Sequence, residues 1–143
     1  MRITFLFYFM LSWVLLSAGQ NKTVDSLYAR LVRSKEDTAR VRGLHGLGSY
    51  YSNLSADSCL VYAKKELALS EKLNYPKGIA QAYILYGSGF GLLDSYDRSI
   101  ESYFKALDIY EELADQTGLS TANNNLGYMF YQQGECLIMM LIF

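Results

Sequence analysis

The sequence is poor in the residues that metal sites and disulfide frameworks require. Its 143 residues include two cysteines, Cys59 and Cys136, and one histidine, His45. Two cysteines are too few for a disulfide framework and cannot form a metal site alone, so we expect both thiols to be free. His45 has no cysteine or carboxylate at ligand spacing, which favours a surface or groove histidine over a catalytic one. We therefore expect no cofactor and no bound metal.

The sequence also lacks an excess of positive charge. Its formal net charge is −1, whereas binding to nucleic acid needs a concentrated basic surface, so we expect no nucleic-acid partner. The charge is uneven, with ten Lys or Arg against six Asp or Glu over 22–77 and two against eight over 78–135. Solvated helix faces of differing sign explain this most simply. Head-to-tail self-association of the basic and acidic ends is the alternative.

Proline occurs once, at Pro76, where it suits the first turn of a helix because its missing N–H would have no partner there. Elsewhere apolar residues recur at helical spacing, as Val24, Leu27 and Leu31 do. Asp37 or Thr38 is positioned to cap the helix that follows. The pattern predicts helices over 23–34, 39–53, 57–73, 77–92, 96–114 and 118–132.

The first 19 residues have the order of a secretory signal peptide. Arg2 precedes a nearly unbroken apolar run over 3–16, and small residues occupy 17–19. This run is shorter than the about 20 apolar residues that cross a bilayer. We expect cleavage before Gln20 and an exported protein, periplasmic or membrane-associated. An uncleaved anchor that keeps the chain at a membrane is the alternative.

A repeat organises the remainder of the chain. The segment 78–87 is answered 40 residues later by 118–127, and both begin and end with glycine. A weaker copy lies upstream, since helix-face residues over 59–73 match those over 99–113 at the same step. A period of about 20 to 50 residues is typical of a solenoid. We expect a capping helix over 20–36 and repeats over 37–76, 77–116 and 117–135, the last incomplete.

The final eight residues, 136–143, are apolar without a polar face and abandon the repeat pattern. They are too few to cross a bilayer. Truncation or a shifted reading frame is the interpretation we favour for this atypical tail. A shortened repeat helix and a docking segment are the alternatives.

The expected packing positions of each copy resemble the tetratricopeptide repeat, whose signature places aromatic residues, Leu-Gly and Ala at fixed intervals on two helices. The best copy supplies Tyr83, Gly87, Phe90, Tyr103 and Ala106, the third Leu126, Gly127 and Phe130, and the first Gly48 and Tyr51. The resemblance implies an all-α solenoid of antiparallel helical hairpins. The 40-residue step exceeds the family's usual length of about 34 residues, which implies longer helices.

A narrower resemblance is to the exported N-terminal regions of bacterial sensor proteins. It is carried by Val-Asp-Ser-Leu at 24–27, Lys-Glu-Asp-Thr at 35–38, Tyr-Ala-Lys-Lys at 62–65 and Leu-Asn-Tyr at 73–75. In such proteins the repeats precede a histidine kinase, cyclase or DNA-binding output domain. This implies an alternative function in signal transduction, as a truncated sensor region of a histidine kinase or transcriptional regulator that lacks its output domain.

In the tetratricopeptide family the first helix of each hairpin lines the concave side. The corresponding residues here are mostly polar or aromatic: Arg42, His45, Ser49 and Ser52; Gln81, Ile84, Ser88 and Gly91; Thr121, Asn124, Tyr128 and Tyr131. Such a face suits hydrogen bonding to an extended peptide, with Arg42 as the cation for a carboxylate. An ordinary solvated surface is the alternative.

The sequence contains no catalytic constellation. The run Gly-Ser-Gly-Phe-Gly at 87–91 superficially matches a phosphate-binding loop, but it lies inside an expected helix with no strand before it. Asp94, Asp97 and Glu101 cluster at helical spacing, as expected of a solvated helix start. The sequence therefore predicts a non-enzymatic interaction module that binds a peptide or protein segment outside the cytoplasm.

Overall fold

The computed structural model describes residues 22–134 except 23, 34 and 36. Over this part the chain is helical and contains no strand, which confirms the all-α class. A helical segment at 24–33 precedes α2 (Thr38–Tyr51), α3 (Ala56–Lys72), α4 (Pro76–Gly91), α5 (Tyr96–Glu112) and α6 (Gln116–Gln132). The ends of α2 to α6 lie within two residues of the predicted ones. The predicted signal peptide and apolar tail, with Cys136, lie outside the described residues.

The predicted caps begin two of these helices. The Asp37 carboxylate accepts hydrogen bonds from the backbone N–H groups of Ala39 and Arg40 at 2.9 and 3.1 Å, which satisfies donors that lack a partner within the first turn. Pro76 occupies the start of α4, as expected. Asp115 similarly caps α6 by accepting from Gly118 N at 3.1 Å.

Three helix ends close through a non-glycine residue in the left-handed conformation: Asn74, Asp94 and Ala114, with φ of 48°, 54° and 50°. After α3, the N–H of Tyr75 donates to Ser70 O at 2.9 Å, and 40 residues later the N–H of Asp115 donates to Tyr110 O at 3.0 Å. This bond across five residues is the Schellman closure of a helix. The repeat found in the sequence is therefore also a repeat of backbone geometry.

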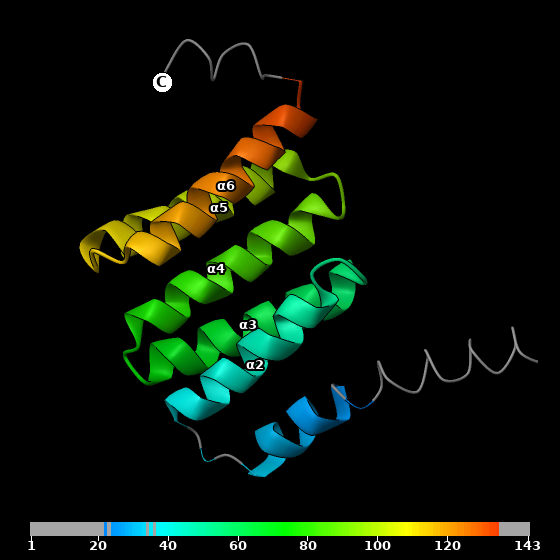
Figure 1. Cartoon of the computed structure of the whole chain (residues 1–143), viewed down its shortest axis with the longest axis vertical. Helices are drawn as coiled ribbons and strands as arrows, with labels where there is room; N and C mark the ends of the chain where they lie inside the picture. The colour runs from blue at the N-terminus through cyan, green and yellow to red at the C-terminus, as the bar shows by residue number, and fades with distance from the viewer. Residues whose placement is uncertain (1–21, 23, 34, 36, 135–143) are drawn as a thin grey trace, which may run out of the picture.

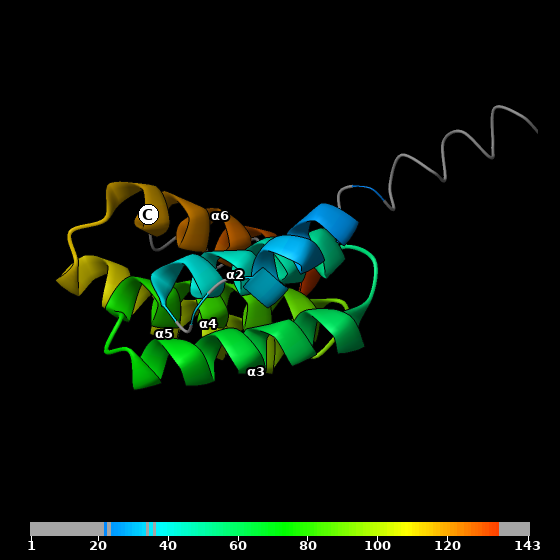
Figure 2. The same cartoon turned by 90° about the horizontal axis from the view of Figure 1, so that it is seen from below.

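Consecutive helices pack against each other and run in opposite directions along the molecule (Figure 1). The first helices of neighbouring hairpins also touch, α2 with α4 and α4 with α6. Seen from below, α2 and α6 lie on the side of the molecule opposite α3 (Figure 2). The helices α2, α4 and α6 thus share one face, on which the predicted binding residues lie.

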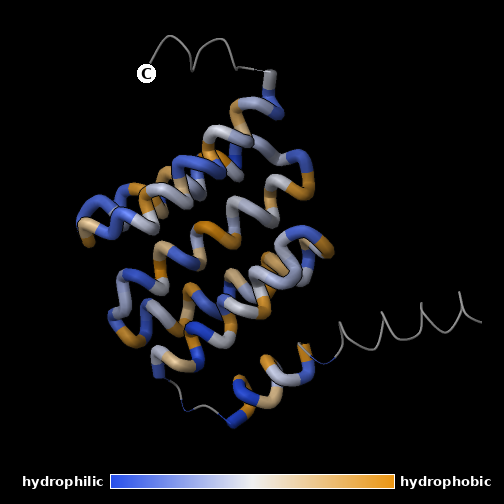
Figure 3. The backbone as a smooth tube through the Cα atoms, viewed as in Figure 1, coloured by the Kyte–Doolittle hydropathy of each residue, from blue (hydrophilic) through white to orange (hydrophobic). Residues whose placement is uncertain are grey.

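The core consists of apolar side chains contributed by every helix, and these recur among polar residues along each helix (Figure 3). The largest cluster joins α4, α5 and α6 and includes Tyr103, Ala106, Tyr110 and Leu126. A second joins α2 and α3, and a third, with Cys59, Ala63 and Leu85, connects α3 to α4. The described helices do not combine the length and apolar character that a bilayer crossing needs.

Two predicted packing glycines face different helices. A Cβ at Gly87 would overlap the ring of Tyr103, so glycine permits the close approach of α4 and α5. A Cβ at Gly48 would instead overlap Leu85, so Gly48 brings α2 close to α4. Of the other predicted packing residues, Tyr103, Ala106 and Leu126 are buried. Five are partly buried: Tyr51, Tyr83, Phe90, Gly127 and Phe130.

Candidate functional site

Among the described residues, two cavities are lined by side chains of α4, α5 and α6 together with residues of α2 or of the turn after it. The larger, which we call the tyrosine cavity, has a volume of about 320 Å³ and is lined by Ser52, Asn53, Ser88, Gly91, Leu92, Asp94, Tyr96, Tyr103, Asn125, Tyr128, Met129 and Gln132. The smaller, the histidine cavity, has a volume of about 190 Å³ and is lined by His45, Lys77, Gln81, Ile84, Tyr110, Asp115, Thr117, Gly118 and Thr121.

The structure divides the predicted binding residues between these cavities and the open surface. The tyrosine cavity takes Ser52, Ser88, Gly91 and Tyr128, and the histidine cavity takes His45, Gln81, Ile84 and Thr121. The remaining four, Arg42, Ser49, Asn124 and Tyr131, are exposed and line neither. Eight of the predicted binding residues therefore line a cavity. Arg42, the expected anchor for a carboxylate, lines neither.

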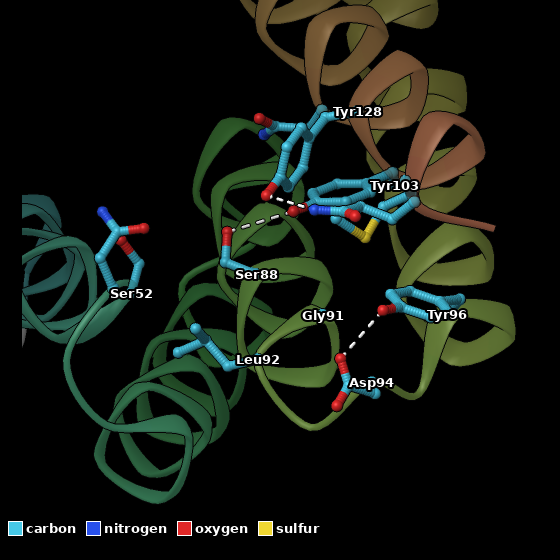
Figure 4. A pocket seen from close by; sticks show the side chains of 12 residues that line it. Ser52, Ser88, Gly91, Leu92, Asp94, Tyr96, Tyr103 and Tyr128 are labelled. Carbon is cyan, nitrogen blue, oxygen red and sulfur yellow. Dashed lines mark hydrogen bonds between the residues drawn. The ribbon is translucent and has the colours of Figure 1, made fainter. Parts of the chain in front are cut away.

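A hydrogen-bonded pair forms one wall of the tyrosine cavity (Figure 4). The Ser88 hydroxyl donates to the carbonyl of Ile84 at 3.1 Å, so the contact of 3.2 Å between Ser88 Oγ and Tyr103 Oη is donated by the tyrosine. Burial raises the pKa of Tyr103, which keeps this donor protonated. The pair fixes two hydroxyl groups between α4 and α5.

Tyr96, Tyr128 and Asp94 also line the tyrosine cavity (Figure 4). The Tyr96 hydroxyl donates to Asp94 Oδ1 at 2.9 Å, and the Tyr128 hydroxyl accepts from Gln132 Nε2 at 2.6 Å. The hydrogen bond to Asp94 raises the pKa of Tyr96 because the carboxylate disfavours a tyrosinate beside it. Asp94 was expected only at a solvated helix start, and no feature of the sequence indicated that it lines a cavity.

The histidine cavity contains a contact that the sequence analysis missed. His45 Nδ1 lies 3.3 Å from Glu66 Oε2, and the Glu66 side chain is fully buried. No carboxylate lies at ligand spacing from His45 in the sequence, but the fold brings one to it from α3, 21 positions away. Burial raises the pKa of Glu66, while the hydrogen bond with His45 opposes that rise.

Three buried polar side-chain atoms have no hydrogen-bond partner within the described residues: Glu66 Oε1 and Ser70 Oγ on α3, and Gln81 Oε1 on α4. Lys77 and Asp115, which both line the histidine cavity, form an ion pair of 2.7 Å between Lys77 Nζ and Asp115 Oδ2. That pairing lowers the pKa of the Asp115 carboxyl. Positive and negative charge are both already present at this cavity.

Ser49, His45 and Glu66 follow one another in the order of nucleophile, base and acid, since Ser49 Oγ lies 3.4 Å from His45 Nε2. Ser49 lies inside α2, however, where backbone N–H groups bond within the helix and cannot form an oxyanion hole. The backbone of α2 therefore gives these three residues no oxyanion hole. In the described part of the chain, no group of three or more His, Cys, Asp or Glu side chains is placed to hold a metal ion.

No protein-family model, no curated protein and no solved structure matches the chain.

Proposed function

We propose that this protein is a non-enzymatic interaction module, a tetratricopeptide-like solenoid that binds an extended peptide or protein segment along the face of α2, α4 and α6. The observation that carries the proposal is the tyrosine cavity, because its lining comes from α4, α5, α6 and the turn that follows α2. A segment lying there would cross successive hairpins, as peptides do in repeat proteins with extended concave surfaces.

The chemistry of the lining supports a peptide ligand. Asn53, Asn125 and Gln132 each carry an amide, which offers both donors and acceptors to a peptide backbone. Tyr128 and Tyr131 on α6 are 56% and 66% exposed, and exposed tyrosines are enriched among the residues that dominate binding energy at interfaces. The signal-peptide pattern at 1–19 supports a binding role outside the cytoplasm.

Selection of a random peptide library against the full immobilised chain, followed by titration of the selected peptides, tests the proposal. Tyr128→Ala should weaken a selected peptide about tenfold or more, as expected for a central aromatic contact. Phe104→Ala is the matched control, because Phe104 is also an aromatic residue about half exposed, at 46%, but lies on α5 and lines neither cavity.

Unchanged helical circular dichroism must accompany both variants. If peptides bind but the Phe104 variant weakens them as much as the Tyr128 variant, or if neither does, the α2, α4 and α6 face is not the binding surface.

A further inference from the structure

The tyrosine cavity is lined by residue types that bind cations, but in the described part of the chain its lining includes no basic side chain. Its lining includes three tyrosines and one carboxylate, Asp94, and among the described residues that line it none is Lys or Arg. A carboxylate accepts hydrogen bonds only, and tyrosine rings attract cations through their faces. The histidine cavity differs, because Lys77 already neutralises Asp115 there.

The nearest part of the sequence is short of positive charge. Between 78 and 134 the chain has two basic residues, Arg98 and Lys105, and both are engaged. The Arg98 guanidinium lies 3.9 Å from the centre of the Phe90 ring, and Lys105 Nζ lies 2.6 Å from Glu101 Oε1. Neither residue lines the tyrosine cavity, so its carboxylate has no internal counter-ion there.

The acid is held in place by the backbone. Asp94 is the left-handed residue of the turn between α4 and α5, and its N–H donates to Gly91 O at 3.1 Å. The next N–H, that of Ser95, donates to Phe90 O at 3.0 Å. Because the hydrogen bond from Tyr96 also fixes the side chain, little conformational entropy remains to be lost on binding.

We propose that the tyrosine cavity receives an arginine side chain of the bound segment, with Tyr96 and Tyr128 as aromatic walls and Asp94 as the counter-ion. This inference rests on the proposed function, since it names one side chain of the segment bound there. A planar guanidinium has the donors for the carboxylate and for the amide oxygens of Asn125 and Gln132, and it stacks on aromatic faces. The cation of the complex thus comes from the partner and not from Arg42.

Nuclear magnetic resonance titration of the full chain tests the inference with two blocked tripeptides, acetyl-Ala-Arg-Ala-amide and acetyl-Ala-citrulline-Ala-amide. Citrulline keeps the shape of arginine but carries no charge. The arginine peptide should shift the amide signals of Gly91, Tyr96 and Asn125 and bind about tenfold more tightly than the citrulline peptide, the ratio expected for one cation–π contact with a carboxylate.

Asp94→Asn should remove most of that ratio. Asparagine tolerates the left-handed conformation, so the turn is retained. Asp108→Asn is the control, because it removes the same charge from an exposed position of α5 that does not line the cavity, and it should leave the ratio unchanged.

The outcomes separate the two proposals. Equal binding of both peptides at the cavity, or an arginine preference that survives Asp94→Asn, would overturn the arginine site and leave the peptide-binding face intact. If free arginine amide shifts the cavity signals and competes with the tripeptide at equal affinity, while library peptides bind elsewhere, the arginine site stands and the proposed function fails. Absence of any shift at the cavity would overturn the arginine site.

Discussion

The two hairpins α2–α3 and α4–α5 differ most at one buried position of their second helices. In the first hairpin this position holds Glu66, and 40 residues later in the second it holds Ala106, both with no exposed surface. One turn further along, the first hairpin buries Ser70 where the second buries Tyr110. The backbone that follows is nevertheless closed by the same hydrogen bond in both.

The hairpins also differ in how well their buried polar groups are satisfied. In the second hairpin, Ser99 Oγ donates to Gly87 O and Ser102 Oγ donates to Arg98 O, each at 2.7 Å. Within the described residues, the unpaired buried atoms are Glu66 Oε1 and Ser70 Oγ in the first hairpin and Gln81 Oε1 in the second. An unpaired buried polar group costs about 1 to 3 kcal/mol, so we expect the first hairpin to be the less stable. The repeat backbone accepts a charged core residue, but at a cost in stability.

The largest effect should come from moving the buried acid into the second hairpin. Ala106→Glu places a carboxylate beside Tyr103, Tyr110 and Leu126, in a cluster whose buried members include no histidine. We expect a loss of about 3 to 5 kcal/mol in the free energy of unfolding, the usual cost of a buried charge without its partner. Urea denaturation followed by circular dichroism at 222 nm measures it.

Ala68→Glu is the control for that experiment, since it introduces the same residue at an exposed position of α3 and should change stability by no more than about 0.5 kcal/mol. A loss under about 1 kcal/mol for Ala106→Glu would show that the second hairpin accepts charge as readily as the first.

A smaller effect is expected from neutralising the acid where it now lies. Burial raises the pKa of Glu66 above its ordinary value, so the folded state binds a proton more tightly than the unfolded state does. Its contribution to stability is therefore complete below the unfolded pKa and declines as pH rises through the folded pKa. Glu66→Gln should stabilise the protein by about 1 kcal/mol at pH 8 and by less at pH 4.

Unfolding of the parent and the Gln variant across this pH range provides the measurement. A variant that is less stable than the parent at pH 8 would mean that the ionised pair with His45 is net stabilising. The buried acid would then not make the first hairpin the less stable of the two.

The smallest effect is expected at the matched left-handed residues. Ala114→Gly should raise stability by about 0.5 to 1 kcal/mol, because alanine is strained at φ of 50° and glycine is not. Asn74→Gly should be nearly neutral, since asparagine already tolerates φ of 48°. Thermal melting of both variants compares the turns directly, and an equal gain from each would show that residue type does not distinguish them.

The helices could be predicted because their signals are local. Asp37 and Pro76 mark helix starts through their own chemistry, and the glycines repeated at 78 and 118 mark the same point in successive units. Such features depend on a few neighbouring residues, so a pattern in the sequence suffices to find them.

The contents of the site could not be predicted in the same way. Glu66 on α3 contacts His45 on α2, and the turn between α4 and α5 brings Asp94 to the tyrosine cavity. Asn125 lines the tyrosine cavity, whereas the predicted Asn124, one position earlier, is exposed. These outcomes depend on how the helices pack, which the periodicity of a single helix does not specify.

The rate at which the Cys59 thiol is modified would report on this packing. It is fully buried, its Sγ lies 3.3 Å from Leu85 O, and burial raises its pKa to about 11. Because only the thiolate reacts with disulfide reagents, modification of Cys59 has to await separation of α3 from α4. The rate at which mass spectrometry finds this one residue modified would therefore report how often the boundary between the two hairpins opens in the native protein.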